Sequence, residues 1–196
     1  MSRSTSTYHH GNLRPVLLAA ALDLLETQSA AALSLREVAR RAGVSHNAPY
    51  HHFGDRSGLL AAAGAEAMRQ LVAAQRAAYE AEADPRDALV ALGVAYVEWA
   101  VAHPGAFGVI YDPEICAPGA PSETMAPLIA ANEELLSAAI AATDPRPDGT
   151  TGRAAELAAR EAGAWGSVHG LAALVTAGHL PRAAVRPALE SLFPRS

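Results

Sequence analysis

The polar side chains with the clearest potential chemistry lie between residues 46 and 51. His46, Asn47, Tyr50 and His51 can each hydrogen-bond to DNA bases or phosphates. An asparagine side chain can pair with adenine through two hydrogen bonds, and a small residue such as Ala48 can contact a thymine methyl group. These residue types together predict a surface that reads the edges of DNA bases.

The residues from 34 to 53 have the form of two short helices joined by a tight turn. Ser34 is a good N-cap, and Glu37 can reach back to its backbone N–H to complete a capping box. Gly43 stands where a left-handed C-terminal cap favours glycine, and Ser45 can cap the next helix. The pattern predicts a helix-turn-helix, whose second helix enters a DNA major groove.

The second helix is predicted to run from His46 to about Phe53. Pro49 lacks an N–H group and disfavours helical geometry at Ala48, so we expect a distorted or 3₁₀ first turn. An ordinary helical hairpin inside a bundle is the alternative interpretation of the motif.

Two further helices are predicted around the hairpin. Apolar residues at helical spacing indicate a helix from about Asn12 to Gln28. Asp55 is a candidate N-cap for a long helix from Arg56 to about Ala83. The expected order is therefore helix, helix-turn-helix and long helix.

The segment from Tyr8 to Leu60 resembles the DNA-binding domain of the TetR family of one-component transcriptional regulators. The resemblance is carried by Ala19–Ala20, Leu24–Leu25, Ser34–Ala39, Ala42–Ser45, Tyr50–Phe53 and Asp55–Leu60. It implies DNA contacts from Ser34, Arg36, Ser45, His46, Asn47, Ala48, Tyr50, His51 and Arg56. The sequence departs from the family at Arg56, where lysine is common, and at Gly58, where helix formers are common.

A second resemblance lies in the C-terminal part. Trp165–Leu171 is similar to a Trp-His-Gly signature that names one branch of the family, and Tyr96–Phe107 also resembles that branch. The resemblance implies that this part senses a small molecule and dimerises. It further implies regulation by release from DNA when the small molecule binds.

The charges are distributed unevenly along the chain. The net charge of the 196 residues is −5, which argues against a general nucleic-acid binder. Residues 1–60 hold six Arg and four acidic residues, giving +2, whereas the remainder holds nine Arg and sixteen acidic residues, giving −7. We predict an all-α protein with a three-helix DNA-binding domain at 1–60, including an arm at 1–11, and a helical ligand-binding and dimerisation domain at 61–196.

The C-terminal part is predicted to be helical, with breaks at its proline-rich and glycine-rich stretches. The expected helices span about 85–103, 106–111, 123–142 and 151–177, with a last helix from after Pro181 to about Leu192. Candidate ligand-binding residues are its bulky side chains and one histidine: Tyr96, Trp99, Phe107, Tyr111, Met125, Trp165 and His169. The alternative is that they form the core. Cys116 is expected to be a small apolar filler, with redox sensing as the minor alternative.

Small residues recur on one stripe of the helix predicted at 151–177. Gly163, Gly166, Gly170 and Ala173 would let another helix pack closely. If two subunits present the same stripe, the two C-terminal helices of each form a two-fold four-helix interface. Packing against a helix of the same chain is the alternative.

The sequence therefore predicts a regulator, most simply a repressor, that binds a palindromic operator as a homodimer and is released by a small molecule. A helical scaffold without specific DNA binding is the alternative. Metal-ligand spacings, serine-nucleophile motifs and phosphate loops are all lacking in the sequence, so we expect no enzyme, cofactor or metal. Without an apolar signal region or long apolar run, we expect no membrane association and a cytoplasmic protein.

Overall fold

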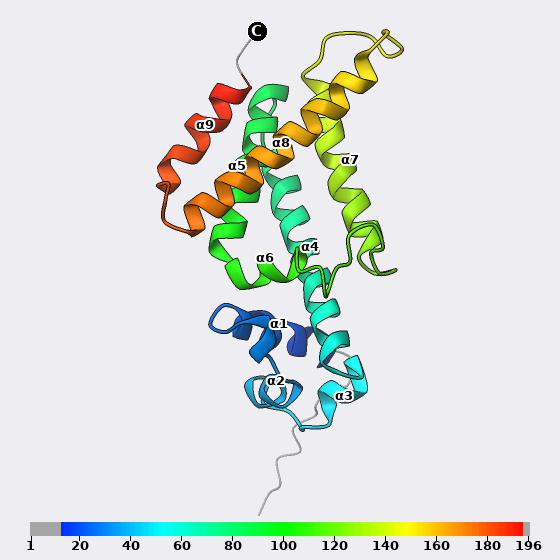
Figure 1. The fold of residues 1–196 in the computed structure, drawn as a ribbon, viewed down its shortest axis with the longest axis vertical. Coiled ribbons are helices and arrows are strands. Elements are labelled where there is room, and N and C mark those ends of the chain that lie inside the picture. The colour runs from blue at the N-terminus through cyan, green and yellow to red at the C-terminus, as the bar shows by residue number, and fades with distance from the viewer. Residues whose placement is uncertain (1–12, 194–196) are drawn as a thin grey trace, which may run out of the picture.

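The computed structural model describes residues 13–193, and every regular element in that range is a helix (Figure 1). The first elements are α1 (Leu13–Leu25), the 3₁₀ turn η1 (Ala30–Ala32), α2 (Leu35–Arg41), α3 (Ala48–Phe53) and α4 (Arg56–Glu80). The others are α5 (Pro85–Ala102), α6 (Pro104–Ile110), α7 (Ala126–Ala142), α8 (Arg153–Thr176), the 3₁₀ turn η2 (Arg182–Ala184) and α9 (Val185–Leu192). The predicted all-α fold is confirmed.

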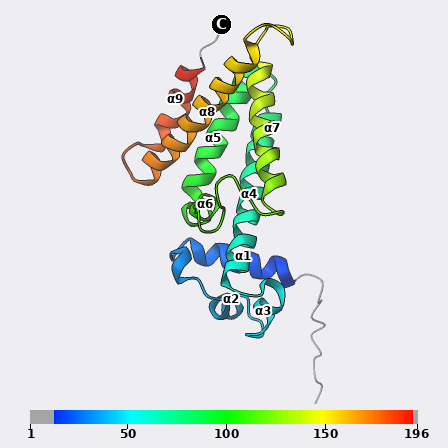
Figure 2. The same ribbon diagram turned by 45° about the vertical axis from the view of Figure 1, so that its right-hand side comes forward.

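The molecule is elongated, with α1–α3 at one end and α5–α9 at the other (Figures 1 and 2). We name α1–α3 with the first turn of α4 the head, and the rest of the described chain the body. Helix α4 runs through both parts: Leu59 and Leu60 are buried in the head core, whereas Met68 and Leu71 are buried in the body core. The predicted domain boundary at residue 60 falls inside this continuous helix and stays a prediction.

Helix α3 begins at Ala48, two residues later than predicted. The backbone N–H of Ala48 donates to the carbonyl oxygen of Ser45 at 3.0 Å, which is a 3₁₀-type bond. His46 and Asn47 therefore form a turn that leads into the helix. The expected distorted first turn is confirmed, and Pro49 is buried beneath it.

Helices α5 and α6 meet at a sharp bend of 109° around His103. The bend brings Gly105 against the end of α1, where an added Cβ atom would lie 1.9 Å from the carbonyl oxygen of Leu25. Nδ1 of His103 also lies 3.8 Å from a carboxylate oxygen of Glu26, just after α1. The body thus touches the head through α6 as well as through α4. No single helix in residues 13–193 is long and apolar enough to cross a membrane, and only the bent α5–α6 pair passes by length and composition.

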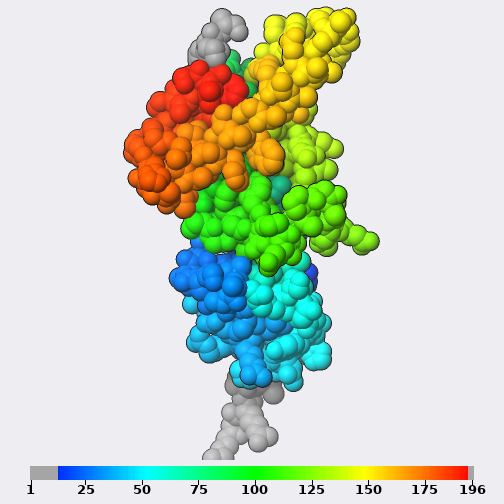
Figure 3. All heavy atoms as spheres, in the orientation of Figure 1, coloured from blue at the N-terminus to red at the C-terminus, as the bar shows by residue number. Residues whose placement is uncertain are grey.

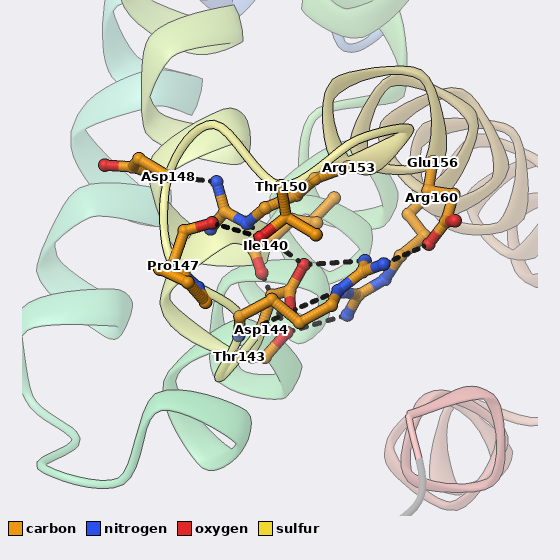
Figure 4. Close-up of polar contacts among 10 residues, drawn as sticks. Ile140, Thr143, Asp144, Pro147, Asp148, Thr150, Arg153, Glu156 and Arg160 are labelled. Atoms are coloured by element: carbon orange, nitrogen blue, oxygen red, sulfur yellow. Dashed lines mark hydrogen bonds and ion pairs between the residues drawn. The ribbon is translucent and has the colours of Figure 1, made fainter.

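An ionic network holds the loop between α7 and α8 (Figure 4). The Asp144 side chain, only 3% exposed, accepts hydrogen bonds from Nε and Nη2 of Arg146 at 3.0 and 2.9 Å. Nε of Arg153 lies 3.3 Å from the same carboxylate, and Nη1 of Arg153 donates to Asp148 at 2.7 Å. The hydrogen bonds from Arg146 hold the pKa of Asp144 well below its usual 3.8.

Replacing Asp144 with asparagine is expected to lower the melting temperature most at neutral pH. Because the pKa is lower in the folded state, the carboxylate stabilises the fold above pH 3.8 and loses this effect as the pH falls further. The melting curves of wild type and variant should therefore converge in strong acid. Asp148→Asn is the matched control because the Asp148 side chain is 97% exposed, and it should change little. A difference that stays constant from pH 7 to pH 2 would contradict the prediction.

Candidate functional site

The helix-turn-helix is held by the local contacts that its sequence indicates. Oγ of Ser34 accepts a hydrogen bond from the backbone N–H of Glu37 at 3.2 Å. Gly43 adopts a φ of +68°, and the backbone N–H of Val44 closes the end of α2 by donating to Ala39 at 3.0 Å. The other half of the expected capping box is absent from the described contacts. The Glu37 carboxylate lies instead 3.6 Å from Arg40.

The predicted base-reading side chains lie at the start of α3 and in the turn that precedes it. His46, Asn47, Tyr50 and His51 are all exposed, whereas Ala48 is half-buried. A hollow of about 660 Å³ is lined by Arg36, His46, Asn47 and Tyr50. The turn therefore places a cation of α2 beside the polar residues that precede and begin α3.

The two predicted serine contacts already hold the backbone. Oγ of Ser34 caps α2, and Oγ of Ser45 accepts from the backbone N–H of Asn47 at 3.4 Å. Each hydroxyl still has its O–H group free to donate, and a DNA phosphate oxygen could accept that hydrogen bond. Both serines are exposed, so their predicted phosphate contacts are compatible with their capping roles.

Arg56 has an internal role that the sequence did not indicate. Its guanidinium donates to the carbonyl oxygens of Ala30 and Leu33, the latter at 3.1 Å, and ties η1 to the start of α4. Its predicted phosphate contact stays a prediction and would have to share these donors. Other head arginines are also engaged, since Arg41 pairs with Asp23. Within residues 13–193, Arg36 has no ion-pair or hydrogen-bond partner. The predicted arm at 1–11 lies outside the described residues.

The body contains a cavity of about 720 Å³ among α4, α6, α7 and α8. Its apolar lining comes from Met68, Ile110, Met125, Ile129, Leu136 and Trp165, among others. Of the predicted ligand residues, Tyr111, Met125 and Trp165 line this cavity. Tyr96, Trp99, Phe107 and His169 are not among its lining residues.

Three of the remaining predicted residues, Tyr96, Phe107 and His169, build an aromatic cluster with Tyr111 of the cavity wall. The hydroxyl of Tyr96 lies 2.9 Å from the hydroxyl of Tyr111 and 3.0 Å from Nδ1 of His169. The ring of Phe107 packs edge-on against Tyr96 at 5.6 Å between centroids. Burial raises the pKa of both tyrosines above 10.0, so both phenols stay neutral. Trp99 is buried apart from them and stacks near His103.

Sequence reasoning missed the polar part of the cavity. Glu133, Glu134 and Glu161 line it together with Asn132, but on the sequence they looked like ordinary surface residues of amphipathic helices. Cys116, expected to be a filler, lines it as well. In the described part of the chain, no group of three or more His, Cys, Asp or Glu side chains could hold a metal ion.

The small residues of α8 face outward. An added Cβ atom at Gly163, Gly166 or Gly170 would meet nothing within 4 Å. Figure 3 shows α8 and α9 lying at the surface on this side of the body. Packing of this stripe against a helix of the same chain is therefore wrong for the described residues.

Two family models match the chain. Residues 17–63 match the bacterial regulatory proteins of the tetR family, and residues 89–195 match the tetracyclin repressor-like C-terminal domain. The chain belongs to the TetR family. It is therefore a DNA-binding transcriptional regulator and not an enzyme. The Trp-His-Gly branch within the TetR family stays a prediction.

Solved structures share this TetR fold over nearly the whole chain. A Rhodococcus sp. RHA1 protein of unknown function is 35% identical, with a TM-score of 0.79 and 96% of each chain covered. The TetR regulator PfmR from Thermus thermophilus is 22% identical, with a TM-score of 0.66, covering 90% of this chain and 96% of its own. FadR from Bacillus subtilis, solved with stearoyl-CoA, is 12% identical, with a TM-score of 0.68 and coverage of 92% and 97%. None of the curated proteins matches this chain.

Proposed function

We propose that this protein is a repressor that binds a palindromic operator as a homodimer and leaves it when a small molecule occupies the body cavity. The observation that carries the DNA part is the hollow lined by Arg36, His46, Asn47 and Tyr50. An unpartnered cation suited to a phosphate stands there beside hydrogen-bonding groups suited to base edges, and a helix-turn-helix in a major groove uses both kinds of contact.

The proposed DNA contacts divide by chemistry. Asn47, His46, Ala48 and His51 would read base edges, because they lie at or near the exposed start of α3. Ser34, Arg36, Ser45, Tyr50 and Arg56 would contact phosphates and fix the register of the head on the duplex. The proposed functional division is a DNA-binding part at 1–60 and a ligand-binding and dimerising part at 61–196.

The outward face of α8 supports a homodimer. Beside its bare glycines stand Trp165, which is 50% exposed, and Leu174, and α9 adds Leu192, also 50% exposed. A groove of about 770 Å³ next to Gly163 runs between α5, α8 and α9. A second copy offering the same two helices would cover this apolar face and form a four-helix interface. The two recognition helices would then read half-sites about one DNA turn apart.

The position of the cavity supports control by a ligand. Its wall includes Met68 of α4 and both Ile110 and Tyr111 at the end of α6. Helix α4 continues into the head, and α6 packs on α1 through Gly105. A ligand that fits one arrangement of these helices better than the other shifts the population and changes DNA affinity.

A selection from random duplexes tests the DNA part of the proposal. The purified protein should enrich a palindromic site and bind it with one dimer, as measured by fluorescence anisotropy at two or more salt concentrations. Weak binding that is independent of sequence would refute the proposal.

Two substitutions in the head should separate the contacts that recognise bases from the contacts that bind phosphates. Asn47→Ala should narrow the affinity gap between the operator and its single-base variants by about tenfold at one position. Arg36→Ala should weaken binding to all sequences by about three- to tenfold and reduce the salt slope by about 1. Arg76→Ala on α4 removes the same charge from an exposed site outside the head and serves as the control. Equal behaviour of Arg36→Ala and Arg76→Ala would contradict the assignment of Arg36.

A further inference from the structure

The body cavity has a one-sided charge. Three carboxylates line it, those of Glu133, Glu134 and Glu161, and its lining includes no arginine or histidine. Within residues 13–193, none of the three has an ion-pair or hydrogen-bond partner. Glu161 is half-buried, whereas Glu133 and Glu134 are exposed at the rim. The cavity therefore presents unneutralised negative charge to whatever enters it.

Much of the remaining lining of the cavity is apolar. Met68, Ile110, Met125 and Ile129 line it from α4, α6, the turn before α7 and α7 itself, and Leu136 adds a further side chain. A volume of about 720 Å³ lies within the range of cavities that hold small organic molecules. An alkyl or aryl body would replace water there without leaving a polar group unpaired.

The aromatic residues of the wall also favour a cation. Trp165 lines the cavity on the same helix as Glu161, one helical turn away, and an indole face attracts ammonium groups. The neutral hydroxyl of Tyr111 is engaged with Tyr96 at 2.9 Å, and Tyr96 also contacts Nδ1 of His169. When Tyr96 donates to Nδ1, Tyr111 must donate to Tyr96, and the Tyr111 oxygen then keeps a lone pair that accepts from a ligand N–H.

We propose that the effector of this protein is an amphipathic organic cation, an apolar amine or quaternary ammonium compound. Its apolar body lies among Met68, Ile110 and Met125, and its charged group lies between Trp165 and the carboxylates. An anionic ligand of the same size would meet three carboxylates and no cation. The inference rests on the proposed function in one respect, because it takes the cavity as the effector site. Binding of a ligand to the cavity can be measured without DNA.

Three ligands with one alkyl chain test the charge preference. Decyltrimethylammonium, decanol and decanoate are titrated into the intact protein below their micellar concentrations, with binding followed by calorimetry. Decyltrimethylammonium is expected to bind at least about tenfold more tightly than decanoate, and the affinity of decanol should lie between the two. Added salt should weaken the binding of decyltrimethylammonium only. Equal affinities, or tighter binding of decanoate, would overturn the charge preference and leave the cavity as an apolar site. No binding of any of the three would overturn the ligand assignment altogether.

A substitution locates the effect. Glu161→Gln should lower the affinity for decyltrimethylammonium about tenfold and leave that for decanol unchanged. Glu82→Gln removes the same charge from an exposed residue outside the cavity and should alter neither. If both variants lose affinity equally, the net charge and not the cavity causes the preference, and the proposal fails. Operator binding of the same samples is measured in parallel, so a failure of DNA recognition is seen separately.

Discussion

Replacing Gly166 with arginine is expected to lower the affinity for a palindromic operator by about 100-fold or more. The glycine faces outward, and an added Cβ atom would meet nothing within 4 Å in the subunit, so the fold of one chain should survive. A second copy of α8 could no longer approach, and each head would then bind its half-site alone. Losing the linked second half-site removes the gain that two joined binding modules give. Light scattering after size-exclusion chromatography and anisotropy with the palindromic duplex measure the two effects.

Gly108→Arg is the matched control for this prediction. Gly108 is also an exposed helical glycine with nothing within 4 Å of an added Cβ atom, but it belongs to α6 and not to α8. The control should remain dimeric and bind the operator as the wild type does. A Gly166→Arg protein that is still dimeric and still binds tightly would show that the dimer forms elsewhere.

Gly105→Ala is expected to destabilise the protein by about 2 kcal/mol or more. The new methyl group would lie 1.9 Å from the carbonyl oxygen of Leu25 and 2.5 Å from its carbon, and both are backbone atoms that cannot rotate away. Helix α6 or the end of α1 would have to move. The melting temperature should fall by about 4–8 °C in a chain of this size.

Gly108→Ala controls for the general effect of alanine in the same helix. That change gains up to about 1 kcal/mol of helix propensity and meets no neighbour, so its melting temperature should stay equal or rise. If the two variants have the same melting temperature, the contact between α6 and α1 is looser than described. If Gly105→Ala lowers the stability but ligand binding is retained, the disturbed contact is the one between α6 and α1, where the body meets the head.

The sequence predicted those parts of the fold that depend on near neighbours. Ser34 and Asp55 cap α2 and α4 as expected, since each accepts from a backbone N–H three residues ahead. Gly43 follows the end of α2 in the left-handed conformation, and a single glycine in the sequence is enough to predict this. The exposed face of α3 followed from the same local rules. Its first turn was predicted to be distorted because Pro49 acts on the residue just before it.

The features that escaped prediction depend on residues far apart in the chain. The Arg56 side chain donates hydrogen bonds to carbonyl oxygens 23 and 26 residues earlier in the chain. No local sequence pattern predicts such contacts for an arginine. The division of the aromatic residues between cavity and cluster depends on how α6, α7 and α8 cross. Tyr111 therefore lines the cavity while Tyr96, with the same chemistry, is buried behind it. Glu161 joins the cavity by the same crossing.

In the proposed release from DNA, the length of α4 sets the scale of the motion that is needed. Its 25 residues span about 37 Å without a break from the head to the far end of the body. The helix acts as a lever, so a tilt of about 5° around Met68 in the cavity wall moves the head end of α4, about 18 Å away at Arg56, by about 1.6 Å. In a two-fold dimer the two heads would move in opposite directions, and their spacing would change by about 3 Å. That is about a quarter of the width of a major groove, so a small tilt at the cavity weakens the fit of both heads at once.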